Sequence, residues 1–269
     1  MMKKLYTPLA FLFSLFAAFT LNGCKESEGD VGPIVRKDLP AFNKIDVAQN
    51  VSVNLRAGEQ VLEIRGDGQL EQVVAEVENG ELKLYNPSGL ASNVVVDIWV
   101  SNLKLLSCRE NSITNILEDF STNSSSLSII GKNAAKIRVK NSLNYESVYF
   151  ELRDASNMAI ANLQASKAQG ELLNGTRCHI EGQIGQLELN MTDGCRFNLD
   201  FPDADLSLST PVVTENCVIT AKNGAQAWVQ ASNKLQVNVS DGSRVFYKGE
   251  PQEIVKELHN GGQVEKKEE

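Results

Sequence analysis

Asn174-Gly175-Thr176-Arg177-Cys178 and Asp193-Gly194-Cys195-Arg196-Phe197 are two copies of a short pattern that recurs along this chain of 269 residues. Each copy has a polar residue, a small residue, then Ala, Ser, Thr or Cys, and an apolar residue two positions later. The copies begin at positions 133, 154, 174, 193 and 241, and weaker copies begin at Asn111 and Glu215. Spacings of 19 to 26 residues are typical of a solenoid, in which each repeat forms one coil.

Short alternating segments lie on both sides of the pattern. Leu187-Glu188-Leu189 precedes one copy and Phe197-Asn198-Leu199 closes it, so that every second side chain is apolar. Alternation inside coils of this length predicts strands that stack in parallel about 4.8 Å apart. The sequence therefore predicts an all-β fold, a parallel β-helix of about seven short coils over residues 103–251. The general crossover preference favours right-handed winding.

The repeated pattern is interpreted as a corner of the coil. Asn or Asp followed by Gly tolerates the left-handed backbone of a tight turn, so Gly175, Gly194 and Gly242 are expected to be structural corner residues. The Ala, Ser, Thr or Cys that follows is expected to point into the core. Cys195 and Cys217 are expected at the same position in successive coils, either as a disulfide or as buried free thiols.

Residues 41–102 form an N-terminal β region that either continues the solenoid or caps it. Alternating apolar residues separated by Gly and Pro predict five strands there. The strands are expected at Phe42–Val47, Val51–Leu55, Val61–Ile64, Glu81–Tyr85 and Val94–Val100. The stretch Leu70–Val77 is expected to be extended because it is rich in Val. Residues 252–269 are expected to be a C-terminal segment that ends in a disordered charged tail.

The N-terminus has the features of an export signal. Lys3 and Lys4 precede an apolar run, and Leu21-Asn22-Gly23-Cys24 resembles the cleavage site of bacterial lipoproteins. The sequence predicts a signal peptide at residues 1–23, lipid attachment at Cys24 with fatty acids such as palmitate, and a tether at residues 24–40. A diacylated Cys24 would hold the protein on the outer membrane without a transmembrane helix, at the cell surface or on the periplasmic face.

Composition argues against several classes of partner and cofactor. The formal net charge is −8, which excludes nucleic acid as an expected partner. Four cysteines remain besides Cys24, and their spacing matches no zinc pattern. These cysteines are Cys108, Cys178, Cys195 and Cys217. We expect no metal and no cofactor.

Candidate catalytic and calcium-binding residues have simpler structural explanations. Asp200, Asp203 and Asp205 form the best acidic cluster, near Arg196, but Phe201–Asp205 is typical of a turn. A stacked row of Asp could bind Ca²⁺. The three residues of that row occupy corner positions that alternate with Asn, which favours a structural role. These residues are Asp154, Asp193 and Asp241. Neither His179 nor His259 lies near a nucleophile motif, so no catalytic residue is expected and the protein is not predicted to be an enzyme.

The chain resembles the auto-transporter adhesin, head GIN domain family of secreted and lipid-anchored bacterial proteins. The resemblance rests on Phe42-x-x-Ile45-x-Val47, on the repeated corner and on Tyr247-Lys248-Gly249-Glu250-Pro251. The family's Gly-Ala/Ser corner is matched by Gly175-Thr176, Gly194-Cys195 and Gly242-Ser243. Other residues stand at the place of this Gly in four corners, at Ser112, Ala134, Ala155 and Asn216. The resemblance implies a β-helix-like solenoid with a role at the cell surface.

The predicted function is an outer-membrane-anchored lipoprotein whose solenoid is a non-enzymatic binding or adhesion module. Polar residues alternate with core residues along every coil, so the outside could meet a glycan or an extracellular protein. Trp99 and Trp228 are candidates for sugar stacking, but their apolar strands favour core positions. Two alternatives stay open: a glycan-active enzyme on the same scaffold, as a polysaccharide lyase or hydrolase, and a purely structural envelope protein.

Overall fold

The computed structural model describes residues 33–87, 89–121, 125–200, 206 and 208–267. This part of the chain is almost entirely β-structure, and all of its strands belong to one continuous hydrogen-bonded system. No helix within the described residues is long and apolar enough to cross a membrane. The predicted signal peptide, Cys24, Asp203 and Asp205 lie outside the described residues.

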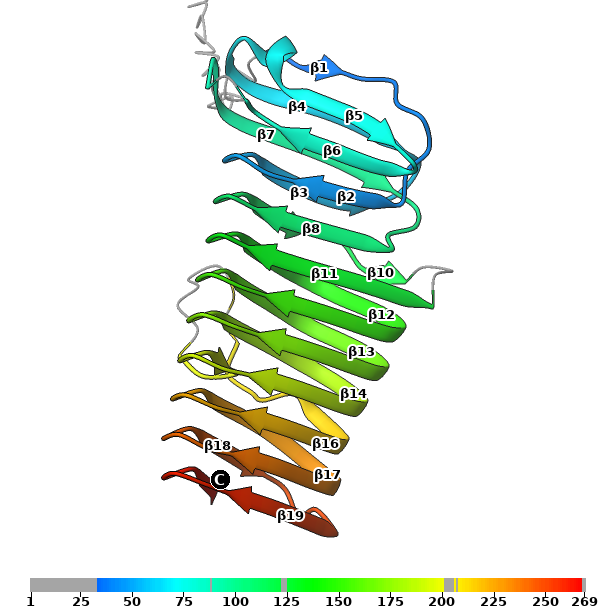
Figure 1. Ribbon diagram of the computed structural model, residues 1–269. Coiled ribbons are helices and arrows are strands. Elements are labelled where there is room, and N and C mark those ends of the chain that lie inside the picture. Colours follow the sequence, from blue (N-terminus) through cyan, green and yellow to red (C-terminus); the bar gives the residue numbers. More distant parts are fainter. Residues whose placement is uncertain (1–32, 88, 122–124, 201–205, 207, 268–269) are drawn as a thin grey trace, which may run out of the picture. The chain divides into compact units, whose positions relative to one another are not determined.

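Parallel strands build a β-solenoid of about eight turns, which confirms the predicted fold class (Figure 1). Each full coil has two long sides and one short side. The strands of the first long side, face 1, pair in parallel from coil to coil. They are β2 (Lys44–Val47), β8 (Leu105–Arg109), β11 (Ser126–Lys132), the C-terminal parts of β12 (Lys136–Leu152), β13 (Asn157–Leu172) and β14 (Arg177–Met191), most of β16 (Val213–Ala221), the C-terminal part of β17 (Gln226–Val239), and β19 (Glu253–Leu258).

The second long side, face 2, is built in the same way. Its strands are β3 (Ser52–Ala57), β9 (Ile113–Ile116), the N-terminal parts of β12, β13, β14 and β17, β15 (Arg196–Phe197), β18 (Arg244–Lys248) and β20 (Gln263–Lys266). The short side, face 3, contains β10 (Phe120–Ser121), the middle residues of the long strands and the start of β16. Several strands bend from one side to the next without ending.

The N-terminal region both continues and caps the solenoid. β6 (Glu81–Tyr85) and β7 (Ala91–Val100) pair in parallel with β2 and β3, so the first coil lies between them and the rest of the stack. β4 (Val61–Gly68) pairs antiparallel with β7, and β5 (Val74–Glu78) pairs antiparallel with β6. The short β1 (Val35–Arg36) pairs with β4. We call β4–β7 the N-terminal cap, because its antiparallel strands close this end of the stack.

The five strands predicted in this region are all present, as β2, β3, β4, β6 and β7. The stretch predicted to be extended is mixed: Leu70–Gln72 form a 3₁₀ turn, and β5 follows it.

Each corner between face 1 and face 2 contains two consecutive residues with positive φ. Asp193 and Gly194 have φ of 58° and 70°, and Asp154 and Ala155 have 54° and 58°. Gly175, Gly194 and Gly242 hold the second position of their corners, where an added Cβ would meet nothing within 4 Å. Side chains at the third position are fully buried. They are Val51, Ser112, Ala135, Ser156, Thr176, Cys195, Ala225 and Ser243.

Two details of the predicted repeat are wrong. The weak copy at Glu215 lies inside β16, and the corner of that coil is Asn223-Gly224-Ala225. The copy at Asn111 is shifted by one residue, because the corner begins at Glu110. An insertion between β15 and β16 lengthens one coil, which hid the true period at that place.

The two cysteines expected at equivalent positions are not equivalent. Cys195 lies in a corner, whereas Cys217 lies on face 1 between Leu187 and Leu235 of the neighbouring coils. All four described cysteines are free and buried. Burial raises the pKa of the Cys108 and Cys217 thiols to about 12, so they behave as small apolar side chains.

The solenoid also extends beyond residue 251, where the sequence predicted a C-terminal segment that ends in a disordered charged tail. β19 and β20, with a corner at Asn260-Gly261, add a further coil that reaches Lys266. Strand periodicity is weak there because the inward positions are not all apolar.

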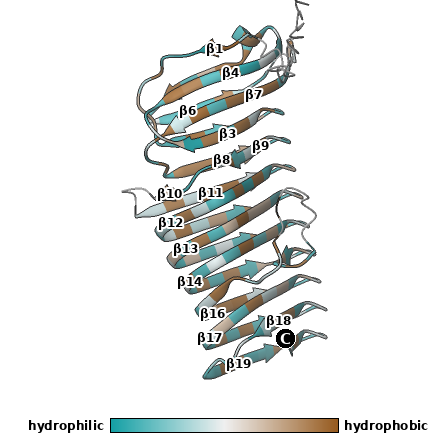
Figure 2. Cartoon of the chain, turned by 180° about the vertical axis from the view of Figure 1, so that it is seen from behind, coloured by the Kyte–Doolittle hydropathy of each residue, from teal (hydrophilic) through white to brown (hydrophobic). Residues whose placement is uncertain are grey.

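Side chains that point inward stack from coil to coil and form one continuous core. Apolar and polar residues alternate along the strands accordingly (Figure 2). Inward side chains of neighbouring coils, which we call rungs, are matched in size. A Cβ on Gly170 would overlap the buried ring of Phe150 in the adjacent coil. The Phe150 ring in turn lies 6.5 Å from that of Phe197, centroid to centroid, across the core.

Candidate binding groove

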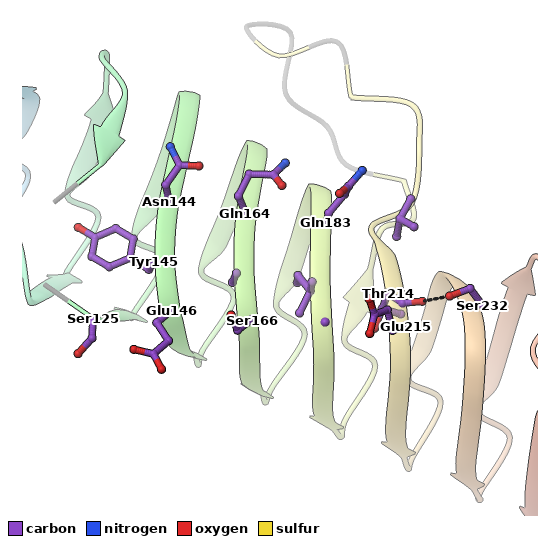
Figure 3. A pocket seen from close by; sticks show the side chains of 14 residues that line it. Ser125, Asn144, Tyr145, Glu146, Gln164, Ser166, Gln183, Thr214, Glu215 and Ser232 are labelled. Carbon is purple, nitrogen blue, oxygen red and sulfur yellow. Dashed lines mark hydrogen bonds between the residues drawn. The ribbon is translucent and has the colours of Figure 1, made fainter. Parts of the chain in front are cut away.

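The bend from face 3 to face 1 is hollowed along several coils. It forms an open groove of about 870 Å³ that runs along the stack (Figure 3). Most of its lining is polar. The groove is lined by Ser125, Asn144, Tyr145, Glu146, Gln164, Ala165, Ser166, Gln183, Ile184, Gly185, Val213, Thr214, Glu215 and Ser232.

A row of side-chain amides borders the groove. Strand register places Asn144 beside Gln164 and Gln164 beside Gln183, so three successive coils each contribute one amide (Figure 3). Paired strands are about 4.8 Å apart, which spaces these amides regularly along the stack. The row gives hydrogen-bond donors and acceptors at a repeat close to one coil.

The floor of the groove is more firmly fixed than its border. Tyr145 is 5% exposed and donates its hydroxyl to the Leu103 carbonyl oxygen at 3.1 Å. Thr214 is 1% exposed and donates to the Asn216 carbonyl oxygen at 2.9 Å. Gly185 lies in the bend, where a Cβ would come within 2.7 Å of the Ser166 carbonyl oxygen. A larger residue at this position would therefore disturb the floor.

Several groups on the border have no partner within the described chain. The side-chain amides of Asn144 and Gln183 make no hydrogen bond with described residues, and the carboxylates of Glu146 and Glu215 make no ion pair with them. Gln164 donates to the Asn162 Oδ1 at 2.7 Å, which fixes its orientation. Groups that the fold leaves unpaired in a concave surface are available to a ligand.

The two carboxylates of the groove are too far apart to act as a glycosidase pair. Glu146 directly follows Tyr145, and Glu215 directly follows Thr214. In the strand register Tyr145 and Thr214 are three strand steps apart. This places their backbones roughly 14 Å apart. Paired carboxylates of glycoside hydrolysis are at most about 9.5 Å apart. In Figure 3 the coils that carry Gln164 and Gln183 lie between them.

The other residues considered from sequence lie elsewhere. Asp200 forms an ion pair with Arg196, the first residue of β15. The side chain of Asp200 is 71% exposed. The remaining members of that acidic cluster are outside the described residues. No group of three or more His, Cys, Asp or Glu in the described chain is arranged to hold a metal ion.

The corner carboxylates have a structural role. Asp154 accepts a hydrogen bond from the Asn174 amide at 2.7 Å, and Asp193 accepts one from Asn223 at 2.9 Å. Asp241 accepts one from Asn260 at 2.9 Å, and this bond lowers the pKa of the Asp241 carboxyl. Amide–carboxylate bonds thus link three pairs of neighbouring corners.

The expectation that both tryptophans are core residues is wrong. Trp99 on β7 of the cap and Trp228 on face 2 are half-buried and point outward, between inward neighbours that are buried. The Arg56 guanidinium carbon lies 5.9 Å from the Trp99 ring centroid, and Lys267 Nζ lies 4.8 Å from that of Trp228. Neither ring lines the groove.

His179 and Glu181 hold the segment that leads into β16 against face 2. Glu181 Oε1 accepts backbone N–H groups of Ser209 at 2.6 Å and Thr210 at 2.8 Å. Burial opposes ionisation of this carboxyl, but the hydrogen bonds from Thr210 and Ser209 lower its pKa below the ordinary value. Burial lowers the pKa of His179, which is 4% exposed and contacts the Thr210 carbonyl oxygen.

Sequence reasoning did not find the groove, although a signal was present. Asn144, Gln164 and Gln183 recur at the coil period, with the same polar character at the same phase. Following one phase of the repeat would have found the amide row. It could not have shown that the bend is concave.

The fold and this repeated corner agree with a known protein family. The family described as "Putative auto-transporter adhesin, head GIN domain" matches residues 41–251. The chain belongs to this family. The family name supports an adhesin-like, non-enzymatic module at the cell surface.

Two solved structures of Parabacteroides proteins have the same fold as this chain. One, described as a putative lipid binding protein from Parabacteroides distasonis, has 13% identity and a TM-score of 0.76, with 89% of this chain and 98% of that chain covered. Another, a putative adhesin from Parabacteroides merdae, has 16% identity and a TM-score of 0.74, with 90% and 98% covered. Comparison with curated proteins gives no match. At such identities the likeness concerns the fold alone.

Proposed function

We propose that this protein is an adhesion module that binds an extended glycan chain in the groove. The observation that carries the proposal is the row of amides from Asn144, Gln164 and Gln183 beside a concave floor. Amides and hydroxyls are suited to the hydroxyl groups of sugars, because they both donate and accept hydrogen bonds. A regular row along the coil axis suits a ligand that is itself a chain.

The charge of the groove restricts the class of ligand further. Glu146 and Glu215 are its charged residues, and both are exposed. Carboxylates without a cationic partner repel an acidic polymer and favour a neutral or amine-bearing one. The ligand we propose for the groove is therefore a neutral or amino-sugar polysaccharide rather than a uronic-acid polymer.

The proposed location is the outer membrane, with lipid on Cys24 as the anchor. The support is the sequence around Cys24 and the adhesin-like family. Replacing Cys24 with Ala should release the protein from the membrane fraction, as measured by fractionation of cells that produce the variant. Protease treatment of intact cells then distinguishes the outer surface from the periplasmic face. Retention of the Cys24→Ala variant in the outer membrane would refute lipid anchoring.

Glycan binding is tested with the full chain on an array of neutral, amino and acidic glycans. The informative variant is Gln164→Ala with Gln183→Ala, which removes two amides of the row. We expect at least about tenfold weaker binding, since two or three ligand hydrogen bonds are lost. The matched control is Gln169→Ala with Gln236→Ala, two amides on the outside of face 1, and it should bind as the unchanged protein does.

Three outcomes would contradict the proposal. Equal loss in the groove variant and its control would mean that the amide row has no specific role. Release of shortened chains from a bound polysaccharide would indicate a glycan-active enzyme instead. Absence of binding to every glycan and matrix protein tested would favour a purely structural envelope role.

A further inference from the structure

A basic column lies on face 2, away from the groove. It is formed by the first outward residue of successive strands, which pair in register from coil to coil. The column contains four cations and three amides and no carboxylate. In order along the stack it consists of Lys136, Asn157, Arg177, Arg196, Gln226, Arg244 and Gln263.

Within the described chain, the fold leaves three of these four cations without an ion pair. Lys136, Arg177 and Arg244 form no ion pair with any described residue, and Arg196 pairs only with the exposed Asp200. The nearby corner carboxylates accept hydrogen bonds from Asn residues of the next coil instead. Arg177 and Arg196 lie directly opposite each other on paired strands, an arrangement of like charges that destabilises a sheet. A column that costs stability and lacks internal partners is suited to an external anion.

The cations of this column form a line, and the next outward column on face 2 holds one further cation, Arg138, at the end nearest Lys136. The next outward column on face 2 is buried in its central part, where Ala159, His179 and Asn198 are 0%, 4% and 2% exposed. From Lys136 to Arg244 there are five strand steps, or about 24 Å. Four charges over this length are far sparser than the one charge per ~1.7 Å of duplex DNA. The spacing suits a thin polymer with a charge on every one or two monomers.

We propose that the basic column binds a linear acidic polysaccharide that lies along the coil axis. Its carboxylate or sulfate groups pair with Lys136, Arg177, Arg196 and Arg244, and the intervening amides of Asn157 and Gln226 bind its hydroxyls. Arginine can hold a carboxylate or sulfate through two parallel hydrogen bonds. This site is separate from the groove and takes the opposite class of polymer, so it does not depend on the proposed function.

The test uses the purified full chain with polygalacturonate and heparin as carboxylated and sulfated probes. Neutral dextran, polyadenylate RNA and phosphatidylglycerol vesicles are the comparison probes. We expect binding to one or both acidic polysaccharides that weakens as salt is added. Arg177→Gln with Arg244→Gln should weaken it at least about tenfold, because two charge-assisted contacts are lost. Lys104→Gln with Lys167→Gln removes the same charge from exposed residues outside the column and should change the affinity less than about twofold.

Stability measurements separate a binding role from a structural one. Arg177→Gln removes the repulsion with Arg196, so the unfolding midpoint should stay the same or rise. A clear fall in the midpoint would mean that Arg177 supports the fold, and it would overturn the proposal. Equal losses in the column and control variants would do the same. Comparable binding to the RNA or to the vesicles would show that the column attracts any polyanion, which also overturns a polysaccharide site.

Discussion

The two halves of the solenoid solve the same structural problems with different residues. At the N-terminal end, antiparallel strands β4 and β5 fold back over the stack and bury its apolar edge. At the C-terminal end a last parallel coil is left open, and its residues are mostly exposed. An exposed strand edge invites pairing with other chains unless it is blunted.

Inward lysines blunt the C-terminal end. Lys256 and Lys266 occupy inward positions, because their register partners Val237 and Tyr247 are buried in the core. Lys256 Nζ lies 5.6 Å from the Tyr247 ring centroid, and Lys266 pairs with Glu250. A charge at a core position opposes the stacking of another coil. The antiparallel strands of the cap therefore cover the N-terminal end of the stack, whereas inward lysines protect the C-terminal end.

The corners differ between the halves as well. In the first corners the second position holds Asn50, Asn111, Ala134 and Ala155, all with positive φ. From Gly175 onward the second position is Gly in every described corner. The N-terminal half therefore carries backbone strain at these corner positions that the C-terminal half avoids.

The largest expected effect tests the packing of the two ends. Leu82 of the cap is fully buried, so Leu82→Ala should lower the free energy of unfolding by about 2 to 5 kcal/mol. Leu258 of the last coil is 45% exposed, and Leu258→Ala should cost less than about 1 kcal/mol. Urea unfolding of both variants measures the difference. Equal costs would mean that the last coil is packed as tightly as the cap.

The corner contrast is tested by exchanging residues between neighbouring coils. Ala155 and Gly175 hold the same corner position, with φ of 58° and 69°. Ala155→Gly should stabilise the protein and Gly175→Ala should destabilise it, each by about 1 kcal/mol, because only conformational strain changes. Thermal unfolding of the two variants provides the measurement. Changes of the same sign would contradict the account of strain.

Acidification should lower the stability of the C-terminal half, because His179 and Glu181 contact the segment that leads into β16. Burial lowers the folded-state pKa of His179 below its ordinary 6.5, so its contribution to stability is complete above that value. The contribution is lost as pH falls through 6.5 towards the folded pKa, since the unfolded chain then binds the proton more readily. Glu181 has a lowered pKa too, and its contribution disappears only below the ordinary 4.5.

His179→Gln is the variant that isolates the first effect. As the pH is lowered from 7.5 to 5.5, the free energy of unfolding should decrease less in His179→Gln than in the unchanged protein. Glu181→Gln should not flatten the slope in this range, because the Glu181 carboxylate raises the pKa of His179 and its loss leaves that pKa lower still. Identical slopes for His179→Gln and the unchanged chain would contradict the role assigned to His179.

The smallest expected change in stability concerns the lysines of the last coil. Lys256→Leu with Lys266→Leu should alter unfolding little but should cause end-to-end association that grows with protein concentration. Sedimentation analysis would detect it. Lys222→Leu with Lys248→Leu adds equal apolar surface outside the stack end and serves as the control. A monomeric Lys256/Lys266 variant at high concentration would refute closure by charge.

The sequence contained enough information for the fold but not for the site. Corner chemistry and alternation are local properties, so Asp193-Gly194-Cys195 and its relatives predict coils from short stretches of chain. The concavity near Gly185 depends on how three sides of a coil meet, which no local pattern encodes. The Trp99 and Trp228 positions were misjudged because an apolar strand can carry an aromatic residue on its outer face when another chain segment or side chain lies against it.

The fit between Gly170 and the Phe150 ring implies that the coils are not interchangeable parts. A coil copied or moved to another place in the stack would bring its own inward side chains against rungs shaped for different ones. Duplication within such a gene would therefore be tolerated only together with compensating changes in the adjacent coils. The same reasoning makes the outward columns the freest to vary, so that related chains can inherit one scaffold and present unrelated surfaces.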